Sequence, residues 1–264
     1  MTTLLDDDIR KRVTDPLDSI HQETGDTPFR VFSDWVNLTL ASFTGDEESY
    51  QKTLRRYRSD EFDEDTVDRL VNLHAEALGG LVLGMEESNE DILGGVYEHY
   101  GLTSDRFGQY FTPGPVSRAM AAITIPDDGG LREATLDDPL IIGDISGCGS
   151  GRLIVDSARQ LRKVAPEIPA IFLGYEKDSL CAKMAVINFV LNDITGYVLL
   201  GDALKLVPQK VWSAGTGRLL EGEQPVSVLT AEETDWVVSR FFGEEDRIAA
   251  EETSQESLVD FELD

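Results

Sequence analysis

The stretch IIGDISGCGSGR, residues 141–152, contains three glycines at alternate positions: Gly147, Gly149 and Gly151. Apolar β-forming residues lead into Asp144, and the apolar residues after the glycines favour a helix. A strand, a glycine turn and a helix in this order are typical of α/β proteins that bring bare backbone against a nucleotide-like ligand. Glycine suits such a turn because it adopts positive φ and has no Cβ to hold the ligand away. A tight turn without a ligand is the simpler alternative.

The spacing of the glycines restricts the kind of ligand. The dinucleotide pattern Gly-x-Gly-x-x-Gly fails, because Arg152 occupies the position of its third glycine. The phosphate-loop pattern also fails, because no Gly-Lys-Ser/Thr closes the run. A ligand without phosphates therefore fits better.

A second apolar run, residues 171–175 (IFLGY), ends at Glu176, 25 residues after Gly151. An acidic residue after the second strand of such a unit is placed to accept hydrogen bonds from ribose hydroxyls. A carboxylate suits that role because its two oxygens are both acceptors. The alternative is an ordinary solvated glutamate in a loop.

A third unit follows the same plan. Residues 179–191 (SLCAKMAVINFVL) have helical length, and residues 197–200 (YVLL) form a short apolar run that ends at Asp202. This alternation predicts a parallel sheet with crossover helices, so Asp144, Glu176 and Asp202 are expected at one rim, at the carboxyl ends of the strands. After Asp202 we expect regular structure to decay, with residues 225–229 (PVSVL) as a fourth strand and a short helix over residues 234–242.

Upstream of the sheet, residues 108–115 read GQYFTPGP and precede an apolar helical segment. Pro115 fits the first turn of a helix that begins near Thr112. The free N–H groups of a helix N-terminus also bind carboxylates.

Taken in order, Gly-Gln-Tyr-Phe-Thr-Pro, Gly-Cys-Gly-Ser-Gly, Gly-Tyr-Glu and Gly-Asp-Ala-Leu resemble the motifs of the N6-adenine DNA methyltransferases. The closest group is the modification subunit of type I restriction-modification systems. Residues 91–100 (DILGGVYEHY) also resemble the helix that this family places before its first motif. The resemblance covers about residues 90–205. It implies a Rossmann-like, S-adenosylmethionine-dependent methyltransferase sheet, DNA as substrate, and a specificity subunit as partner.

The resemblance also implies roles for individual residues at the S-adenosylmethionine site. The methionine end of the cofactor is expected against Gln109, Tyr110, Phe111, Thr112 and Pro113. Close backbone approach is expected at Gly147, Gly149 and Gly151, ribose binding at Glu176, and binding of the adenine amino group at Asp202. Asp144 is a further cofactor candidate, although it stands one residue before the acidic position of the family motif.

The family's catalytic tetrapeptide, Asn/Asp-Pro-Pro-Phe/Tyr, is not found in the sequence. After Asp202 there are two prolines, Pro208 and Pro225, and no asparagine. The tetrapeptide holds the exocyclic amine of a flipped base and stacks on its ring. Trp212 offers a stacking surface, but a buried core tryptophan is the favoured interpretation. The catalytic residue is therefore unassigned.

The formal net charge is −27, from 50 acidic and 23 basic residues, and only seven of the basic residues are lysines. This charge argues against DNA binding through a broad basic surface. Arg55, Arg56 and Arg58 form the one local basic cluster and are candidates for phosphate contact. An acidic, lysine-poor composition is also typical of proteins from salt-accumulating halophiles, in which molar salt screens self-repulsion. The alternative is an acidic, solvated surface that is unrelated to high salt.

Composition also bears on redox state, metals and location. Two cysteines, Cys148 and Cys181, provide no disulfide framework, and three histidines lack the spacing of metal ligands. The sequence contains neither a long apolar run nor a signal peptide, so we expect a cytoplasmic protein without a membrane span or a metal.

Three regions are expected: a helical region over residues 1–105, a methyltransferase domain over 106–242 and a disordered acidic tail over 243–264. The helical prediction rests on apolar stripes over residues 28–43 and 65–83. The tail contains nine acidic residues and one basic residue.

Three functional hypotheses follow. The first is an adenine methyltransferase that works alone or with a specificity partner, and the second is a catalytically defective relative that acts as a regulatory or scaffold subunit. The third is an unrelated α/β module that binds a small molecule. The four ordered motifs favour the first two, and the missing tetrapeptide separates the first from the second.

Overall fold

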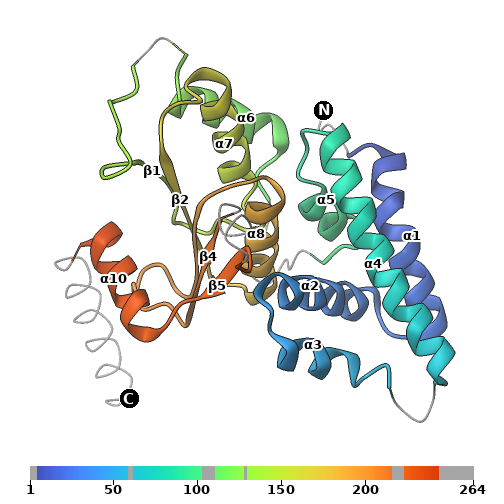
Figure 1. Cartoon of the computed structure of the whole chain (residues 1–264). Helices are drawn as coiled ribbons and strands as arrows, with labels where there is room; N and C mark the ends of the chain where they lie inside the picture. Colours follow the sequence, from blue (N-terminus) through green and yellow to red (C-terminus); the bar gives the residue numbers. More distant parts are fainter. Residues whose placement is uncertain (1–4, 59–61, 103–110, 128–129, 216–222, 244–264) are drawn as a thin grey trace, which may run out of the picture.

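The computed structural model describes residues 5–58, 62–102, 111–127, 130–215 and 223–243. A group of N-terminal helices lies beside a sheet that carries helices on both faces (Figure 1). The N-terminal helices are α1 (Asp7–Thr24), α2 (Pro28–Thr44), α3 (Glu47–Leu54), α4 (Glu64–Glu87) and α5 (Ile92–His99). The predicted helical character of this region is confirmed.

Aspartate and threonine side chains define where these five helices begin. The N-cap residues are Asp6, Thr27, Asp46, Asp63 and Asp91, and each side chain accepts a hydrogen bond from a backbone N–H of the first turn. A cap of this kind contributes about 1 kcal/mol, because it satisfies a donor that the helix leaves free. Part of the acidity of this chain is thus structural.

The sheet has five strands: β1 (Leu140–Asp144), β2 (Ala170–Glu176), β3 (Gly196–Leu200), β4 (Lys210–Ala214) and β5 (Val226–Val228). Their spatial order equals their order in the chain. β1, β2 and β3 are parallel, whereas β4 is antiparallel to β3 and β5 is antiparallel to β4. The Rossmann-like α/β class is confirmed.

The expectation that regular structure decays after Asp202 is wrong. β4 precedes the predicted strand at 225–229, which is therefore the fifth strand, and the helix α10 (Ala231–Phe242) is longer than predicted. β4 is short and carries a lysine and a serine, so its sequence alone gives a weak strand signal. Its side chains after Lys210 are nevertheless buried on both faces of the sheet, with Trp212 on one face and Val211 on the other. This burial favours the strand conformation.

Helices cover the two faces of the sheet unequally. α7 (Arg152–Val164) and α8 (Ser179–Leu191) pack on one face, together with Phe172, Val198 and Trp212. α10 packs on the opposite face, over Tyr175, Leu199 and Val211. The helix α6 (Gly114–Thr124) lies on α7.

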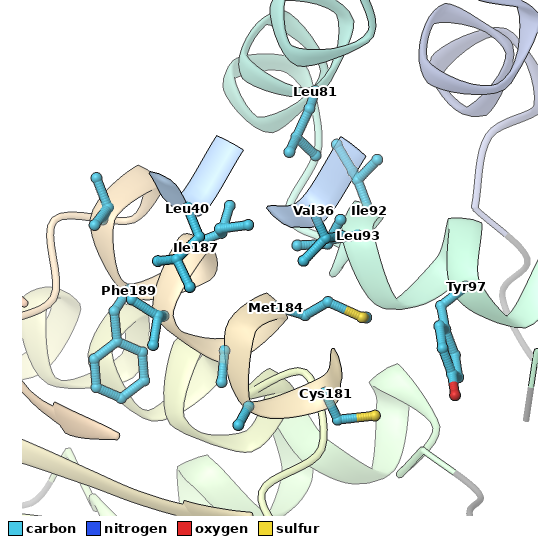
Figure 2. Packing of buried hydrophobic residues seen from close by; sticks show 14 of the residues in the cluster. Val36, Leu40, Leu81, Ile92, Leu93, Tyr97, Cys181, Met184, Ile187 and Phe189 are labelled. Atoms are coloured by element: carbon cyan, nitrogen blue, oxygen red, sulfur yellow. The ribbon is translucent and has the colours of Figure 1, made fainter. Parts of the chain in front are cut away.

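α8 is buried on both of its sides. One side meets the sheet, and the other meets α2 and α5, where Met184 and Cys181 lie close to Val36, Leu93 and Tyr97 (Figure 2). A helix with apolar residues on most of its circumference is expected in such a position. The N-terminal helices and the sheet therefore share one hydrophobic core. The division into three regions at 105 and 242 stays a prediction.

β1, the strand of the glycine loop, forms the edge of the described sheet. In the described residues it pairs with β2 alone. The Leu140 N–H donates to the carbonyl of Pro169, so in parallel pairing Ile141 and Gly143 direct their backbone groups away from β2. Ile141 is 37% exposed, and Ile145, just after the strand, is 47% exposed. As in any edge strand, these backbone groups are available to pair with a further strand.

Both cysteines are free and buried. In the described residues, no helix has the length and apolar character that crossing a membrane requires. Of the predicted tail, residues 244–264 lie outside the described residues.

Candidate functional site

The three acidic residues of the predicted rim follow three parallel strands. Asp144 ends β1, Glu176 ends β2 and Asp202 follows β3. In the sheet register, Asp144 pairs with Gly174, and Glu176 pairs with Leu200. The expectation that these strand ends meet at one edge of the sheet is confirmed. Ligands of open α/β sheets bind outside that edge.

The glycine loop between β1 and α7 needs its glycines. Gly147, Gly149 and Gly151 have φ angles of 126°, 57° and 83°, a region that other residues rarely adopt. Gly151 occupies the N-cap of α7 and makes no side-chain cap, so the first turn of the helix keeps free N–H groups. Gly147 leaves open space beside Glu176, whereas a Cβ on Gly151 would lie against Ala185 of α8.

Glu176 is bonded to this loop. Its Oε2 accepts a hydrogen bond from the Gly149 N–H at 2.8 Å, and its Oε1 accepts one from the Asp178 N–H at 2.7 Å. The residue is 8% exposed. A carboxylate has about four acceptor positions, so each oxygen keeps capacity for a further donor. The backbone thus holds the carboxylate in one orientation, and each oxygen can still accept a hydrogen bond from a ligand.

Phe111, the aromatic residue of the upstream motif, lies directly on the loop. A Cβ at Gly149 would be 2.7 Å from Cε1 of Phe111, a separation that no real Cβ tolerates. The ring is also close to Tyr97, at 5.4 Å between centroids, and the Arg152 guanidinium lies 5.8 Å from its centroid. The space beside the Gly149 Cα is therefore occupied by the ring of Phe111, from the motif that precedes the sheet.

Arg152, which breaks the dinucleotide pattern, joins the upstream motif to the loop. Its Nη1 donates to the Thr112 carbonyl at 2.7 Å. Pro113 is the N-cap of α6, which begins at Gly114, so Pro115 lies in the first turn of a helix that starts near Thr112, as predicted. Gln109 and Tyr110 lie outside the described residues.

The other two rim carboxylates have different environments. Burial raises the pKa of Asp144, against an opposing effect of its hydrogen bonds to Ser146. Asp202 is bonded to Lys177 Nζ at 3.1 Å, and this bond, more than the backbone N–H of Leu204, lowers the pKa of Asp202. Asp144 thus bonds to Ser146 near the start of the loop, whereas Glu176 bonds to Gly149.

Comparison with known proteins agrees with this arrangement. Residues 88–218, about half of the chain, match the family model described as N-6 DNA Methylase. This segment belongs to the N-6 DNA methylase family. The match begins three residues before Asp91 and extends just beyond β4, so it includes the glycine loop and all three rim carboxylates.

Two solved structures are similar to the chain at low identity. A putative class I S-adenosylmethionine-dependent methyltransferase from Listeria monocytogenes is 14% identical, with a TM-score of 0.44, over 75% of this chain and 55% of that one. The methyltransferase subunit of a type I restriction-modification system from Streptococcus thermophilus is 19% identical, with a TM-score of 0.35, over 72% and 43%. The chain thus spans about half the length of each structure. No curated protein matches it significantly.

The structure adds a residue that the sequence interpretation did not single out for the site. Asp91, the N-cap of α5, is 7% exposed and lies behind the glycine loop. Its carboxylate accepts hydrogen bonds from Ser150 Oγ, from Arg152 Nε at 3.3 Å and from Asn188 Nδ2 at 3.0 Å. Asn188 also donates to the Ser150 carbonyl at 2.8 Å. The helix α5, before the upstream motif, therefore anchors the loop that follows β1.

The structure also tests the two nucleic-acid candidates of the sequence, the stacking tryptophan and the arginine cluster. Trp212 is 2% exposed in the core, which confirms the favoured interpretation over base stacking. Arg56 pairs with the carboxylates of Asp26 and Asp34, so its charge is already balanced. In the described residues, no group of three or more metal-ligating side chains gathers.

Proposed function

We propose that this chain binds S-adenosylmethionine and is the cofactor-binding part of a DNA adenine N6-methyltransferase that acts with a partner subunit. The observation that carries the proposal is the bond between the Gly149 N–H and the Glu176 carboxylate. This bond holds the two carboxylate oxygens of Glu176, which can accept from ribose hydroxyls, beside the backbone of the glycine loop.

The residues present fit the cofactor. Glu176 would accept hydrogen bonds from the ribose hydroxyls, and Asp202 would accept one from the adenine amino group. Gly147 is the most open position of the loop, because a Cβ there would meet only Glu176 Oε2, at 3.9 Å. Asp144 and residues 109–113 would lie toward the methionine end. When bound, the cofactor supplies an electrophilic methyl group on a sulfonium, whose positive charge the acidic rim favours.

Adenine methylation also needs a group that holds the exocyclic amine of the target base. The sequence offers no Asn/Asp-Pro-Pro-Phe/Tyr segment. In open α/β sheets, the ligand lies at the point where strand order reverses. Among the described strands the order does not reverse, and the glycine-loop strand is at the edge of their sheet.

The partner is therefore proposed to add a strand parallel to β1 and to bring the amine-holding group with it. The backbone groups of Ile141 and Gly143 would pair with that strand. A second copy of the chain is disfavoured, because each copy has a formal charge of −27. DNA is the proposed substrate, and a specificity subunit is the proposed source of its recognition.

The first test is calorimetric titration with S-adenosylmethionine in about 2 M KCl, where charge repulsion is screened. The wild-type chain is expected to bind, and Gly149→Val is expected not to bind, because its side chain would overlap Phe111. Gly79→Ala is the matched control, since no atom lies within 4 Å of its added Cβ. A folded wild-type chain without affinity for the cofactor would refute the proposal.

The regulatory or scaffold alternative differs from the proposal only at the methyl-transfer step. The chain and its partner would be co-expressed, and the host DNA would be digested with an adenine-sensitive nuclease. Protection that Gly149→Val abolishes is the expected result. Cofactor binding with complete cleavage of the DNA would favour the catalytically defective relative.

A further inference from the structure

Lysines are scarce in this chain, yet three of the seven border one groove. Lys52, Lys183 and Lys210 come from α3, α8 and β4, which are far apart in the sequence. The groove has a volume of about 380 Å³ and lies between α2, α3, α8 and the β4–β5 hairpin. We call it the lysine groove. It shares no residue with the glycine loop or the acidic rim.

The charge in the lysine groove is opposite to that of the molecule. Its lining contains five cationic side chains and two carboxylates. Asp26, outside the lining, pairs with Arg56, so the groove has a formal charge of 5 − 3 = +2 in a chain of −27. The two carboxylates are already engaged. Asp34 is bonded to Arg56 and to the Tyr57 hydroxyl, and Asp46 caps α3 and accepts from Ser49.

The three lysines have no carboxylate within ion-pair distance in the described structure, whereas Lys11 and Lys177 each have one. Lys183 Nζ donates to Asn37 Oδ1 at 2.8 Å, which leaves its charge unbalanced. Burial, and then the charge of Lys210, lower the pKa of Lys183. The ammonium of Lys210 lies 5.4 Å from the ring centroid of Trp212, which lines the groove.

A further donor is free in the lysine groove. The hydroxyl of Ser33 is buried and has no hydrogen-bond partner in the described residues. A buried hydroxyl without a partner is costly, and an anion that accepted its proton would remove that cost. The same anion would relieve the repulsion between Lys183 and Lys210.

We propose that the lysine groove binds a phosphate group of a phosphate-bearing ligand. Lysine ammonium groups bind phosphate oxygens as point charges, from several directions, and a phosphate group offers more than one oxygen to such a cluster. The volume admits a phosphate with an attached sugar but not a duplex. A duplex can nevertheless present one backbone phosphate at its mouth. This inference is independent of the proposed cofactor site.

The test is calorimetric titration of the full chain with inorganic phosphate, adenosine monophosphate and a short DNA duplex, at one ionic strength that keeps the protein folded. Lys183→Met and Lys210→Met each remove one charge and keep the apolar stem. Lys163→Met, on the exposed end of α7, is the matched control. Each groove variant is expected to weaken phosphate binding at least tenfold, and the control is expected to leave it unchanged.

The three ligands separate the two sources of phosphate. Tighter binding of the duplex than of inorganic phosphate, lost in both groove variants, would assign the groove to a nucleic-acid backbone. Binding of phosphate and nucleotide but not of duplex would assign it to a small molecule. Equal affinities in the wild type, the groove variants and the control would overturn the proposal, as would a folded wild-type chain that binds none of the three.

Thermal unfolding provides a second readout for variants that bind too weakly for calorimetry. A ligand that binds only the folded state raises the midpoint temperature of unfolding of the protein. Phosphate is expected to raise the midpoint of the wild type and of Lys163→Met, but not that of Lys183→Met. A rise of equal size in all three proteins would also contradict the proposal.

Discussion

The backbone N–H of Gly149 donates to Oε2 of Glu176 across a distance of 2.8 Å. These two residues are 27 positions apart in the chain, and they join the first and second strands of the sheet at their carboxyl ends. The bond orients the Glu176 carboxylate before any ligand arrives. Preorganised acceptors lower the cost of binding, because their side-chain entropy is already lost.

The first prediction concerns this carboxylate. Glu176→Gln replaces one acceptor oxygen with an NH₂ donor, which cannot accept from ribose and would repel the Gly149 N–H. Hydrogen bonds to charged groups contribute about 1.5–3 kcal/mol, so affinity for S-adenosylmethionine is expected to fall about tenfold or more. Calorimetric titration measures the change. Glu167→Gln, in an exposed turn after α7, is the control, and equal losses in the two variants would contradict the ribose role.

The second prediction concerns Asp91. Asp91→Ala removes the acceptor of Ser150, Arg152 and Asn188 at once and leaves buried donors without partners. The expected loss is about 3 kcal/mol in the free energy of unfolding, measured in urea. The control Asp63→Ala removes an exposed N-cap only and should cost about 1 kcal/mol.

Hydrogen exchange tests whether Asp91 acts on the glycine loop. In Asp91→Ala, the amides of residues 148–152 are expected to exchange faster, whereas Asp63→Ala should leave them unchanged. Loop amides that keep their wild-type protection in Asp91→Ala would show that Asp91 stabilises α5 alone.

The third prediction concerns His74, which is 5% exposed and whose ring nitrogens have no hydrogen-bond partner in the described residues. Burial lowers its pKa from 6.5 to about 4. The unfolded chain therefore binds a proton that the folded chain does not, and stability is full above about pH 6.5 and is lost as the pH falls toward 4. The contribution lost between about pH 7 and pH 5 is about 2 kcal/mol.

His74→Leu removes this proton-linked term. The free energy of unfolding in urea should fall by about 2 kcal/mol less between pH 7 and pH 5 in the variant than in the wild type. Both proteins share every carboxylate, so the difference isolates the histidine. Parallel pH profiles would mean that His74 is not neutral in the folded state.

The fourth prediction concerns the net charge of −27. Between about 0.1 M and 1 M salt, the Debye length falls from about 10 Å to about 3 Å, so repulsion between carboxylates is screened. The midpoint of thermal unfolding is expected to rise as KCl increases through this range. A midpoint that is constant or falls would exclude the halophilic interpretation of the composition.

The sequence by itself determined the local elements and the residues at their ends. Three glycines at alternate positions after an apolar run define a strand, a loop and a helix, because each of these depends on neighbours in the chain. The same holds for Glu176 after β2 and for the rim, which follows from the right-handed alternation of strands and helices. Residues 179–191 also had helical length in the sequence, and they form α8.

The tertiary structure alone decided which distant groups meet. β4 has a weak local signal and is a strand because α8 and α10 bury its two faces. Asp91 and Asn188 are 97 positions apart, and their contact depends on how α5 packs on α8. The lysine groove gathers lysines from three elements, and the edge position of β1 depends on strand order. Such pairings leave no periodic pattern in a single sequence, since they arise from packing rather than from local backbone preference.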